Sequence, residues 1–347
     1  MNPSLTQAAP SMTAVPSPSL RPALRLVKTH ALSREDWLDV RRRGIGSSDA
    51  AAAVGLSPYK SPLQLWTEKT GTARFAEPDP QDDTSPLYWG TLLEPIVAAH
   101  YTRRTGRRVR RVNAVLQHPE HPWMLANLDR EVLGCPEVQI LECKTAGLHG
   151  ARLWRDGVPE YVQLQVLHQL AVTGKQAADV IVLIAGQELQ IHRIERDEAA
   201  IAHLIELEAA FWRCVDERRA PPADGSASAE LALRALHPQD DGRTLDWTQD
   251  TEMSSTFSDL QAIRERLKTF EQQEAQLRQR IQERMGEASM ALFESGEVSL
   301  KRSKDSTVLD TKRLLQEQPH LLQQFPLVRP GTRRFVVRDA TPSTQGE

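Results

Sequence analysis

The chain of 347 residues is 40% hydrophobic and 26% charged, a balance typical of globular proteins with one large domain or two smaller ones. It holds no run of about 18 apolar residues, which argues against a membrane span, and no basic stretch followed by an apolar run near its start, so no secretory signal is expected. The three cysteines, Cys135, Cys143 and Cys214, lack metal-ligand spacing and cannot all pair, which favours a reducing cytoplasm.

A net charge of −3 does not exclude nucleic acid, because binding depends on where the charges lie. Arginines gather at residues 41–43 and again at 103–111, whereas acidic residues gather at 77–83 and around 240–241. An enzyme that collects carboxylates around a metal can bind DNA while being acidic overall. The arginines at 103–111 have two readings, a solvated surface or a contact with the DNA backbone.

The first 220 residues contain a tail and an α/β core. Residues 1–30 are rich in Pro, Ser and Ala, which predicts a disordered tail. A helix is expected to begin near Ser33, because Asp36 follows three residues later as in a capping box. Residues 44–55 predict a loop that enters a short helix. Further helices are expected at 62–71, 88–105, 159–173 and 199–218, and strands at 109–117, 124–132, 138–144, 178–185 and 189–194.

The chain changes character after residue 220. We expect a linker at 221–255, because the stretch begins with Pro, Ala, Gly and Ser. From Leu260 to Ile281 apolar residues recur at alternating three- and four-residue steps, interrupted by Glu274, which predicts a long coiled-coil-like helix. A segment at 297–301, a helix around 312–318 and a closing strand at 333–338 complete an interaction region at 256–340. Its basic residues favour contact with DNA or a partner, and its apolar seam favours self-association.

The segment Asp129…Glu142-Cys143-Lys144 carries the strongest chemical signal. Residues two apart on a strand share a face, so Glu142 and Lys144 project together, and a hairpin would place Asp129 alongside. Two carboxylates and the backbone carbonyl of Cys143 are oxygen ligands of the kind that Mg²⁺ binds. Such a metal lowers the pKa of a bound water and stabilises negative charge, and Lys144 would assist.

An isolated pattern of this kind is more often a surface salt bridge. Here Glu142 and Lys144 lie in a largely apolar segment, and buried charges need partners or a metal. Glu94 and Gln165 likewise lie on helices with mostly apolar neighbours. Together these settings favour a metal-dependent nuclease site.

Several motifs occur here in order and together resemble the YqaJ-type viral recombinase family, relatives of phage lambda exonuclease among the PD-(D/E)XK nucleases. They are Arg43-Gly-Ile-Gly-Ser-Ser-Asp-Ala50, Trp89-Gly-Thr-Leu-Leu-Glu-Pro95, Leu128-Asp129, Leu141-Glu-Cys-Lys-Thr145, Tyr161-Val-Gln-Leu-Gln165 and Val172-Thr-Gly174. The match spans roughly residues 33–200. It implies a restriction-endonuclease-like core, with a mixed central sheet flanked by helices, at residues 31–220, followed by a helical-hairpin or α+β appendage. Leu128 departs from the pattern, which usually has Pro before the aspartate.

The resemblance also assigns roles to residues. It makes Asp129 and Glu142 metal ligands and Lys144 the catalytic lysine, with Glu94 at the metal site. Gln165 matches the glutamine beside that site, and Gln163 replaces it if the register slips. Trp37 and Arg41 match a Trp-x-x-x-Arg pattern. Arg41 would meet a DNA 5′-phosphate, near Ser48 or the neighbouring Ser47, in keeping with the anion preference of helix N-termini.

The resemblance implies a Mg²⁺- or Mn²⁺-dependent enzyme that digests duplex DNA from 5′ to 3′ and leaves 3′ single strands for recombination. It implies DNA ends and a single-strand annealing protein as partners, and a ring-shaped homo-oligomer, a trimer. Two alternatives stay open. One is a structure-specific or restriction-type endonuclease on the same fold, and the other is a DNA-binding recombination module without catalytic activity.

Overall fold

The computed structural model describes residues 22–29, 32–73, 75, 79, 81–329 and 331–338. The chain consists of two compact units, residues 1–238 and residues 239–347. A search of the described residues finds no helix with the length and apolar character needed to cross a membrane. Residues 1–21 of the expected tail lie outside the described part of the chain. Where the tail was expected to continue, Leu24–Lys28 instead form strand β1, because the edge of strand β4 (Ala114–Gln117) supplies their hydrogen-bond partners.

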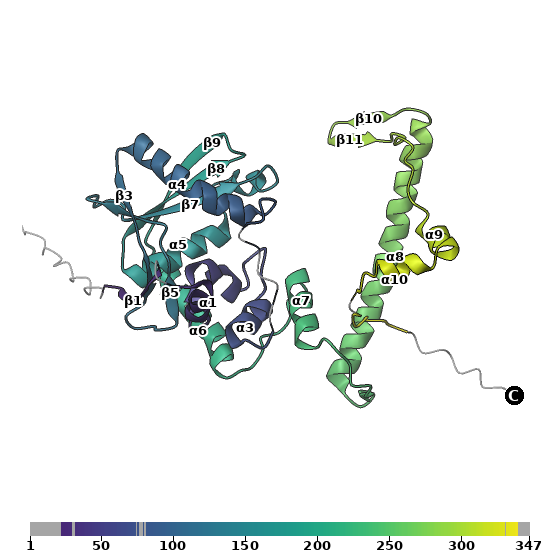
Figure 1. Ribbon diagram of the computed structural model, residues 1–347, viewed down its shortest axis with the longest axis horizontal. Helices are drawn as coiled ribbons and strands as arrows, with labels where there is room; N and C mark the ends of the chain where they lie inside the picture. The colour runs from purple at the N-terminus through teal and green to yellow at the C-terminus, as the bar shows by residue number, and fades with distance from the viewer. Residues whose placement is uncertain are drawn as a thin grey trace, which may run out of the picture. The chain divides into compact units, whose positions relative to one another are not determined.

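Two sheets form the centre of the first unit (Figure 1). One sheet has five strands in the order β3-β6-β7-β8-β9, of which β7 and β8 are parallel and the other neighbours antiparallel. The other has four strands in the order β1-β4-β5-β2. The additional strands are β2 (Ile45–Gly46), β3 (Arg108–Arg111), β5 (Met124–Ala126), β6 (Arg130–Leu133), β7 (Ile140–Ala146), β8 (Ala177–Ile184) and β9 (Glu188–Glu195).

Helices α4 (Pro86–Thr105) and α5 (Glu160–Thr173) cover opposite faces of the five-stranded sheet. Ile140 packs in the core cluster that includes α5, whereas Leu141 and Cys143 pack with α4 residues such as Tyr101. Because strand side chains alternate between faces, Glu142 and Lys144 share the α5 face. This confirms the expected α/β core with a mixed sheet between helices.

With one exception, the remaining helices of the unit begin and end close to their expected positions. Helix α1 (Arg34–Arg42) follows the capping residue Ser33, whose Oγ accepts a hydrogen bond from the backbone N of Asp36. Residues 47–49 form a short 3₁₀ turn, η2, and residues 50–53 form helix α2. The others are α3 (Pro62–Thr70), α6 (Glu198–Asp216) and α7 (Ala227–Leu236).

Helix α7 lies where a linker was expected. The Oγ of Ser228 accepts a hydrogen bond from the backbone N of Ser61 at 2.8 Å and also bonds the side chain of Gln64 on α3. Ala229 and Ala232 are buried in the same core cluster as residues of α3. The boundary expected at residue 220 is therefore too early, because this Ala-rich helix buries its small side chains against the first unit.

Two strands expected as continuous are each split between the two sheets. The stretch expected at 109–117 forms β3 and β4, and the stretch expected at 124–132 forms β5 and β6. In each, a short irregular link carries the chain from one sheet to the other. Asp129 lies in the second link, directly before β6.

The second unit is α+β. It contains the long helix α8 (Thr251–Met285), a hairpin of β10 (Met290–Phe293) and β11 (Gly296–Ser299), and helices α9 (Thr311–Glu317) and α10 (His320–Gln324). The hairpin begins earlier than the segment expected at 297–301. The closing strand expected at 333–338 is wrong, because described residues 331–338 form no strand and Phe335 is largely exposed rather than packed.

Candidate functional site

The middle of β7 places Glu142 and Lys144 beside helix α5. Glu142 is 2% exposed, and both of its carboxylate oxygens are engaged. Its Oε1 accepts from Lys144 Nζ at 2.7 Å and from Gln165 Nε2 at 2.6 Å, and its Oε2 accepts from Gln169 Nε2 at 2.8 Å. Lys144 Nζ also donates to Gln165 Oε1 at 2.9 Å. The buried carboxylate thus holds the ammonium in one position.

The nearby carboxylates stabilise the charged form of Lys144. Burial alone would lower the pKa of Lys144, but the carboxylates of Glu142 and Asp129 outweigh it, and its pKa is raised. Lys144 therefore stays charged at neutral pH. The structure brings Gln165, the preferred glutamine, to this group. Gln163, the fallback, donates from Nε2 to the carbonyl of Val158 instead.

Asp129 reaches β7 from the link between the sheets. Its Oδ2 accepts a hydrogen bond from the backbone N of Cys143 at 2.9 Å, which fixes the carboxylate against the strand. Burial and the neighbouring Glu142 carboxylate raise the pKa of Asp129 to about 8. Burial, together with the carboxylates of Asp129 and Glu142, raises the pKa of the Cys143 thiol, so the sulfur stays protonated at neutral pH.

Glu94 comes from α4 and is paired with an arginine that the sequence did not single out. Arg130 Nη1 donates to Glu94 Oε1 at 2.5 Å and to the backbone carbonyl of Asp129 at 2.6 Å. Both side chains are mostly buried, 10% exposed for Arg130 and 21% for Glu94. One oxygen of Glu94 is thereby committed to a protein cation.

A second polar group contains the residues expected to bind a phosphate. Arg41 Nη2 donates to Asp49 Oδ1 at 2.7 Å and to Ser48 Oγ at 3.3 Å, and its guanidinium lies 4.9 Å from the Trp37 ring centre. Asp49 also accepts from Lys69 Nζ at 2.7 Å. Although burial opposes it, the positive charges of Arg41 and Lys69 hold the pKa of Asp49 far below its usual range. One carboxylate faces two cations here, so the group carries net positive charge. Neither η2 nor α2 has a side chain that forms a capping hydrogen bond at its N-terminus.

One cavity joins these two groups. Its volume is about 360 Å³, and it is lined by every candidate site residue: Arg41, Ser47, Ser48, Glu94, Asp129, Glu142, Cys143, Lys144 and Gln165. A cationic, hydroxyl-bearing group therefore opens into the same space as the carboxylates and the lysine.

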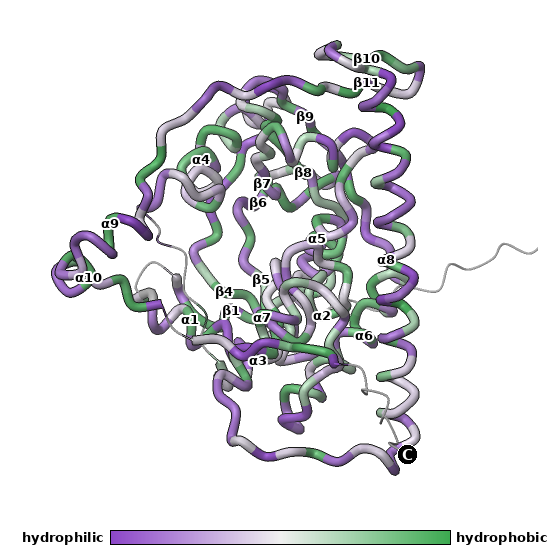
Figure 2. Tube along the Cα trace, turned by 90° about the vertical axis from the view of Figure 1, so that its right-hand side faces the viewer, coloured by the Kyte–Doolittle hydropathy of each residue, from purple (hydrophilic) through white to green (hydrophobic). Residues whose placement is uncertain are grey.

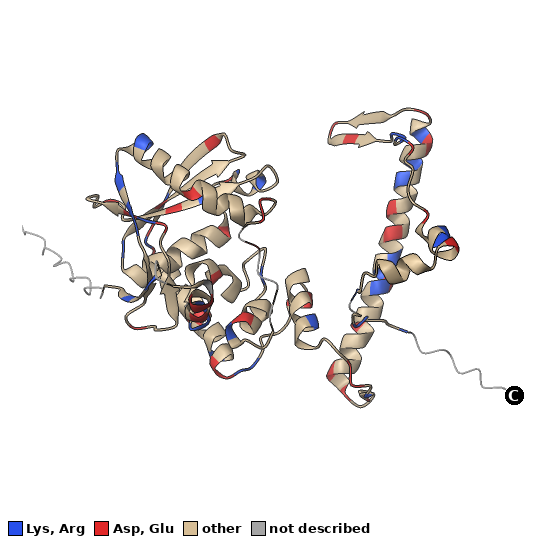
Figure 3. Cartoon of the chain, in the orientation of Figure 1, with Lys and Arg blue, Asp and Glu red and all other residues tan. Residues whose placement is uncertain are grey.

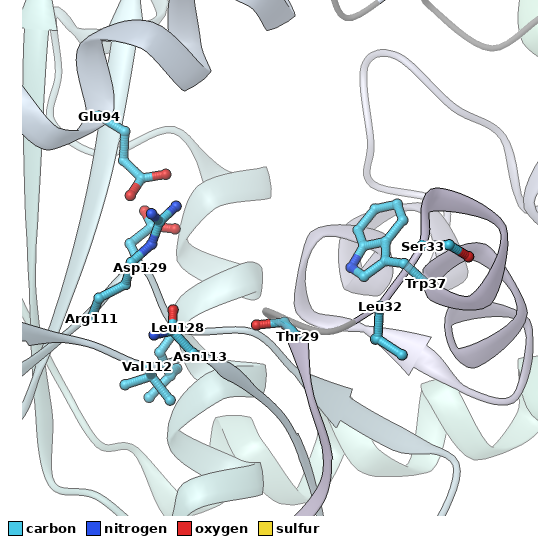
Figure 4. A pocket seen from close by; sticks show the side chains of 10 residues that line it. All are labelled: Thr29, Leu32, Ser33, Trp37, Glu94, Arg111, Val112, Asn113, Leu128 and Asp129. Carbon is cyan, nitrogen blue, oxygen red and sulfur yellow. The ribbon is translucent and has the colours of Figure 1, made fainter.

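A second cavity of about 550 Å³ meets the first at Trp37, Glu94 and Asp129. Figure 4 shows Glu94 and Asp129 on one side of it, near the side chain of Arg111, and Trp37 with Ser33 on the other. The carboxylates thus lie where two hollows join.

The oxygen atoms beside the middle of β7 fit a hard divalent cation. Glu142 supplies a buried carboxylate and Asp129 a half-buried one, and Cys143 contributes a peptide carbonyl from β7. Oxygen ligands of this kind suit Mg²⁺ and Mn²⁺. Burial and the neighbouring Glu142 carboxylate both raise the pKa of Asp129, and a bound cation would oppose both effects. Within the described residues, no three His, Cys, Asp or Glu side chains form a ready-made metal group.

The arginines at 103–111 serve mostly structural roles. Arg107 binds Asp179 and Glu137, Arg110 binds Glu131, and Arg104 Nη1 donates to the carbonyl of Leu189. Arg111 differs, because it lines the second cavity.

The relationship to known proteins is clearest in the sequence. Residues 36–176 match the model of the YqaJ-like viral recombinase domain. The chain is also 33% identical over 323 residues to the YqaJ protein of Bacillus subtilis strain 168, covering 91% of this chain and 98% of that protein. The chain belongs to the YqaJ-like viral recombinase family. Of the motifs that carried the resemblance, all but Val172-Thr-Gly174 contribute residues to the lining of the cavity.

Solved structures similar to this YqaJ-like chain include two exonucleases. An alkaline exonuclease from Laribacter hongkongensis is 22% identical, covering 58% of this chain and 96% of that chain, with a TM-score of 0.44. A phage-related exonuclease from Haemophilus somnus 129PT is 10% identical, covering 52% of this chain and 97% of that chain, with a TM-score of 0.38. The family assignment rests on the sequence relationship.

Proposed function

We propose that this YqaJ-like protein is a divalent-metal-dependent exonuclease that hydrolyses double-stranded DNA from its ends, in the 5′-to-3′ direction, and leaves 3′ single strands for recombination. The observation that carries the proposal is the shared cavity, in which the Arg41 group opens onto Glu142, Lys144 and Asp129. An anion site beside a hydrolytic centre suits an enzyme that binds a terminal phosphate and cleaves the DNA next to it.

Asp129, Glu142 and the carbonyl of Cys143 would hold Mg²⁺ or Mn²⁺. Such a cation supplies Lewis acidity and positive charge at the scissile phosphodiester. Lys144, fixed by Glu142 and Gln165, offers a charged ammonium to the negative charge that develops on the phosphate oxygens. Arg41 and the Ser48 hydroxyl would bind the terminal phosphate, with Ser47 beside them, and Asp49 and Lys69 hold Arg41 in place.

The deciding experiment offers the protein a linear 5′-phosphorylated duplex and a covalently closed circular duplex, each with Mg²⁺. We expect the linear form to be degraded and the circle to stay intact. Nicking or opening of the circle would favour the endonuclease alternative, and binding without hydrolysis of either form would favour a non-catalytic recombination module. Early release of a 5′ label, rather than a 3′ label, would establish the direction.

Two variants connect the activity to this site. Lys144→Ala and Glu142→Gln should each lower hydrolysis of the linear duplex by about 100-fold or more, since the first removes the ammonium that faces the reacting phosphate and the second removes a charged ligand of the metal. Arg41→Ala should reduce the preference for 5′-phosphate over 5′-hydroxyl ends more than it reduces hydrolysis of the 5′-hydroxyl duplex. Unchanged activity in Lys144→Ala and Glu142→Gln would refute the site assignment.

The partners are part of the proposal. The product would be a 3′ single strand, which suits transfer to a single-strand annealing protein, and the expected compartment is the cytoplasm. A homo-oligomer, by resemblance a trimer, would keep the enzyme on one DNA end. The exposed apolar seam of α8 offers a contact between copies of this chain.

A further inference from the structure

Arg130 is a buried cation beside the candidate metal site. It opens β6 in register with Leu141 of β7, and its side chain is only 10% exposed. A single nitrogen, Nη1, donates both to Glu94 Oε1 and to the carbonyl of Asp129. A guanidinium buried in this way is costly unless it is paired, so Glu94 and Arg130 hold each other in place.

The three carboxylates of the site are therefore not equivalent. Glu142 pairs with Lys144 at 2.7 Å, and Glu94 pairs with Arg130 at 2.5 Å. Among the described residues, no lysine or arginine nitrogen forms an ion pair with the Asp129 carboxylate, which instead accepts the Cys143 backbone N–H. The negative charge that is not compensated by a protein cation therefore lies between Asp129 and Glu142 rather than at Glu94.

We propose that Arg130 is a built-in cation that takes the place of a second metal ion, so that the centre binds a single divalent cation and Glu94 positions Arg130 instead of coordinating metal. The inference rests on the proposed metal site and deepens it. Arg130 is a positioning residue in this account. Its guanidinium fixes Glu94 on α4 and, through the Asp129 carbonyl, the backbone that carries a metal ligand.

Mn²⁺ binding to the full chain without DNA tests the inference, with stoichiometry measured by electron paramagnetic resonance and calorimetry. The wild type should bind one Mn²⁺ per chain. Arg130→Met frees Glu94 and should add a second ion, whereas Arg130→Lys keeps the charge and should bind one. Arg110→Gln is the matched control, because Arg110 forms an exposed ion pair with Glu131. It should leave the stoichiometry at one.

A charge-neutral double variant covers the case in which Arg130→Met does not fold. Glu94→Gln combined with Arg130→Gln removes both charges and allows an amide pair in their place. It should still bind one Mn²⁺, with an affinity within about threefold of wild type, since Glu94 is not a ligand. An affinity loss of about tenfold or more in this double variant would identify Glu94 as a ligand and overturn the inference.

The other outcomes separate this inference from the proposed function. Two Mn²⁺ ions in the wild type, or one in a folded Arg130→Met variant, would overturn the inference while leaving exonuclease activity possible. The expected stoichiometries without hydrolysis of linear DNA would keep the inference and refute the proposed function. Glu142→Gln should weaken Mn²⁺ binding in every background, and its failure to do so would place the metal elsewhere and refute both.

Discussion

At the scale of single residues, the site depends on amides as much as on charges. Gln165 and Gln169 are one turn apart on α5, and each donates to a different oxygen of Glu142. Gln165 also accepts from Lys144, so it bridges the two charged groups. The Oε1 of Gln169 is buried and makes no hydrogen bond within the described structure. These contacts fix the direction of the carboxylate, which a metal ligand requires.

Replacing Gln165 by Ala should therefore lower hydrolysis of linear duplex DNA by about tenfold to 100-fold, because Lys144 loses one of its two hydrogen-bond partners. Mn²⁺ binding should weaken at the same time. The matched control is Gln163→Ala on the same helix, whose amide bonds the carbonyl of Val158. Equal losses in the two variants, measured as initial rates, would mean that the register of α5 is misassigned.

Much of the site could be predicted from residue patterns. The common face of Glu142 and Lys144 follows from strand alternation, and Gln165 follows from its place in an ordered motif. Arg130 was missed because an arginine at the start of a strand has no distinctive signal. Its partner Glu94 is 36 residues away, and only the packing of α4 on the sheet brings them together. The roles of Asp49 and Lys69 depended on the same kind of distant contact.

At the scale of elements, a fully buried ion pair joins α5 to α6. His168 Nδ1 lies 2.8 Å from Glu208 Oε1, and His168 Nε2 lies 2.9 Å from the carbonyl of Leu125. Both side chains have 0% exposure. Burial by itself would lower the pKa of His168, but the Glu208 carboxylate and these hydrogen bonds outweigh it, and the pKa is raised. The imidazole belongs to the framework behind the site rather than to a metal centre.

The pair should make stability depend on pH. A raised folded-state pKa contributes stability that is fully present below about 6.5, the unfolded value, and is lost as pH rises through the folded value. Glu208→Gln should therefore lower the free energy of unfolding by about 3–5 kcal/mol at pH 6, and by less above the folded pKa of His168.

Urea unfolding between pH 5.5 and 9 would measure this. Glu206→Gln, an exposed change on the same helix, is the control and should shift stability little at any pH. A difference between wild type and Glu208→Gln that grows with pH would contradict the assignment of a charged His168.

The predicted strands failed where the chain crosses between sheets. Periodicity shows that residues 109–117 and 124–132 are extended, but it does not show that each changes sheet midway. The break in the second stretch positions Asp129, because the link before β6 carries the aspartate to the Cys143 backbone. Local pattern therefore predicts the strands, and long-range pairing decides where the ligand lies.

Helix α8 is the element with the least explained surface. Ile263, Leu267, Phe270 and Leu277 of its seam are each more than half exposed, and no residue of the helix is buried. Figure 2 shows hydrophobic positions recurring along the helix, and Figure 3 shows charges of both signs. Asp259 and Arg266 occupy positions that, in a parallel pair of such helices, face Arg264 and Glu271 of the other copy. Opposite charges would then flank the seam.

At the scale of the whole molecule, the boundary between the two units lies at Pro238 rather than at residue 220. All residues that line the two cavities belong to the first unit, and α7 completes that unit by packing on α3. Composition alone suggested a linker here, because the stretch at 221–255 begins with Pro, Ala, Gly and Ser. Its burial became evident only from the fold.

A chain that ends after Pro238 should therefore retain hydrolysis of linear duplex DNA within about threefold of the full chain, because it keeps the cavity intact. It should lose whatever self-association depends on α8, measured by sedimentation.

A chain that ends after Ala220 is the matched comparison. It removes α7 and exposes the face of α3 that Ala229 and Ala232 cover, so its melting temperature should fall by several degrees below that of the Pro238 form. A folded Pro238 form that lost activity by about tenfold or more would show that the second unit contributes to catalysis. Equal melting temperatures for the two truncated chains would instead restore the earlier boundary.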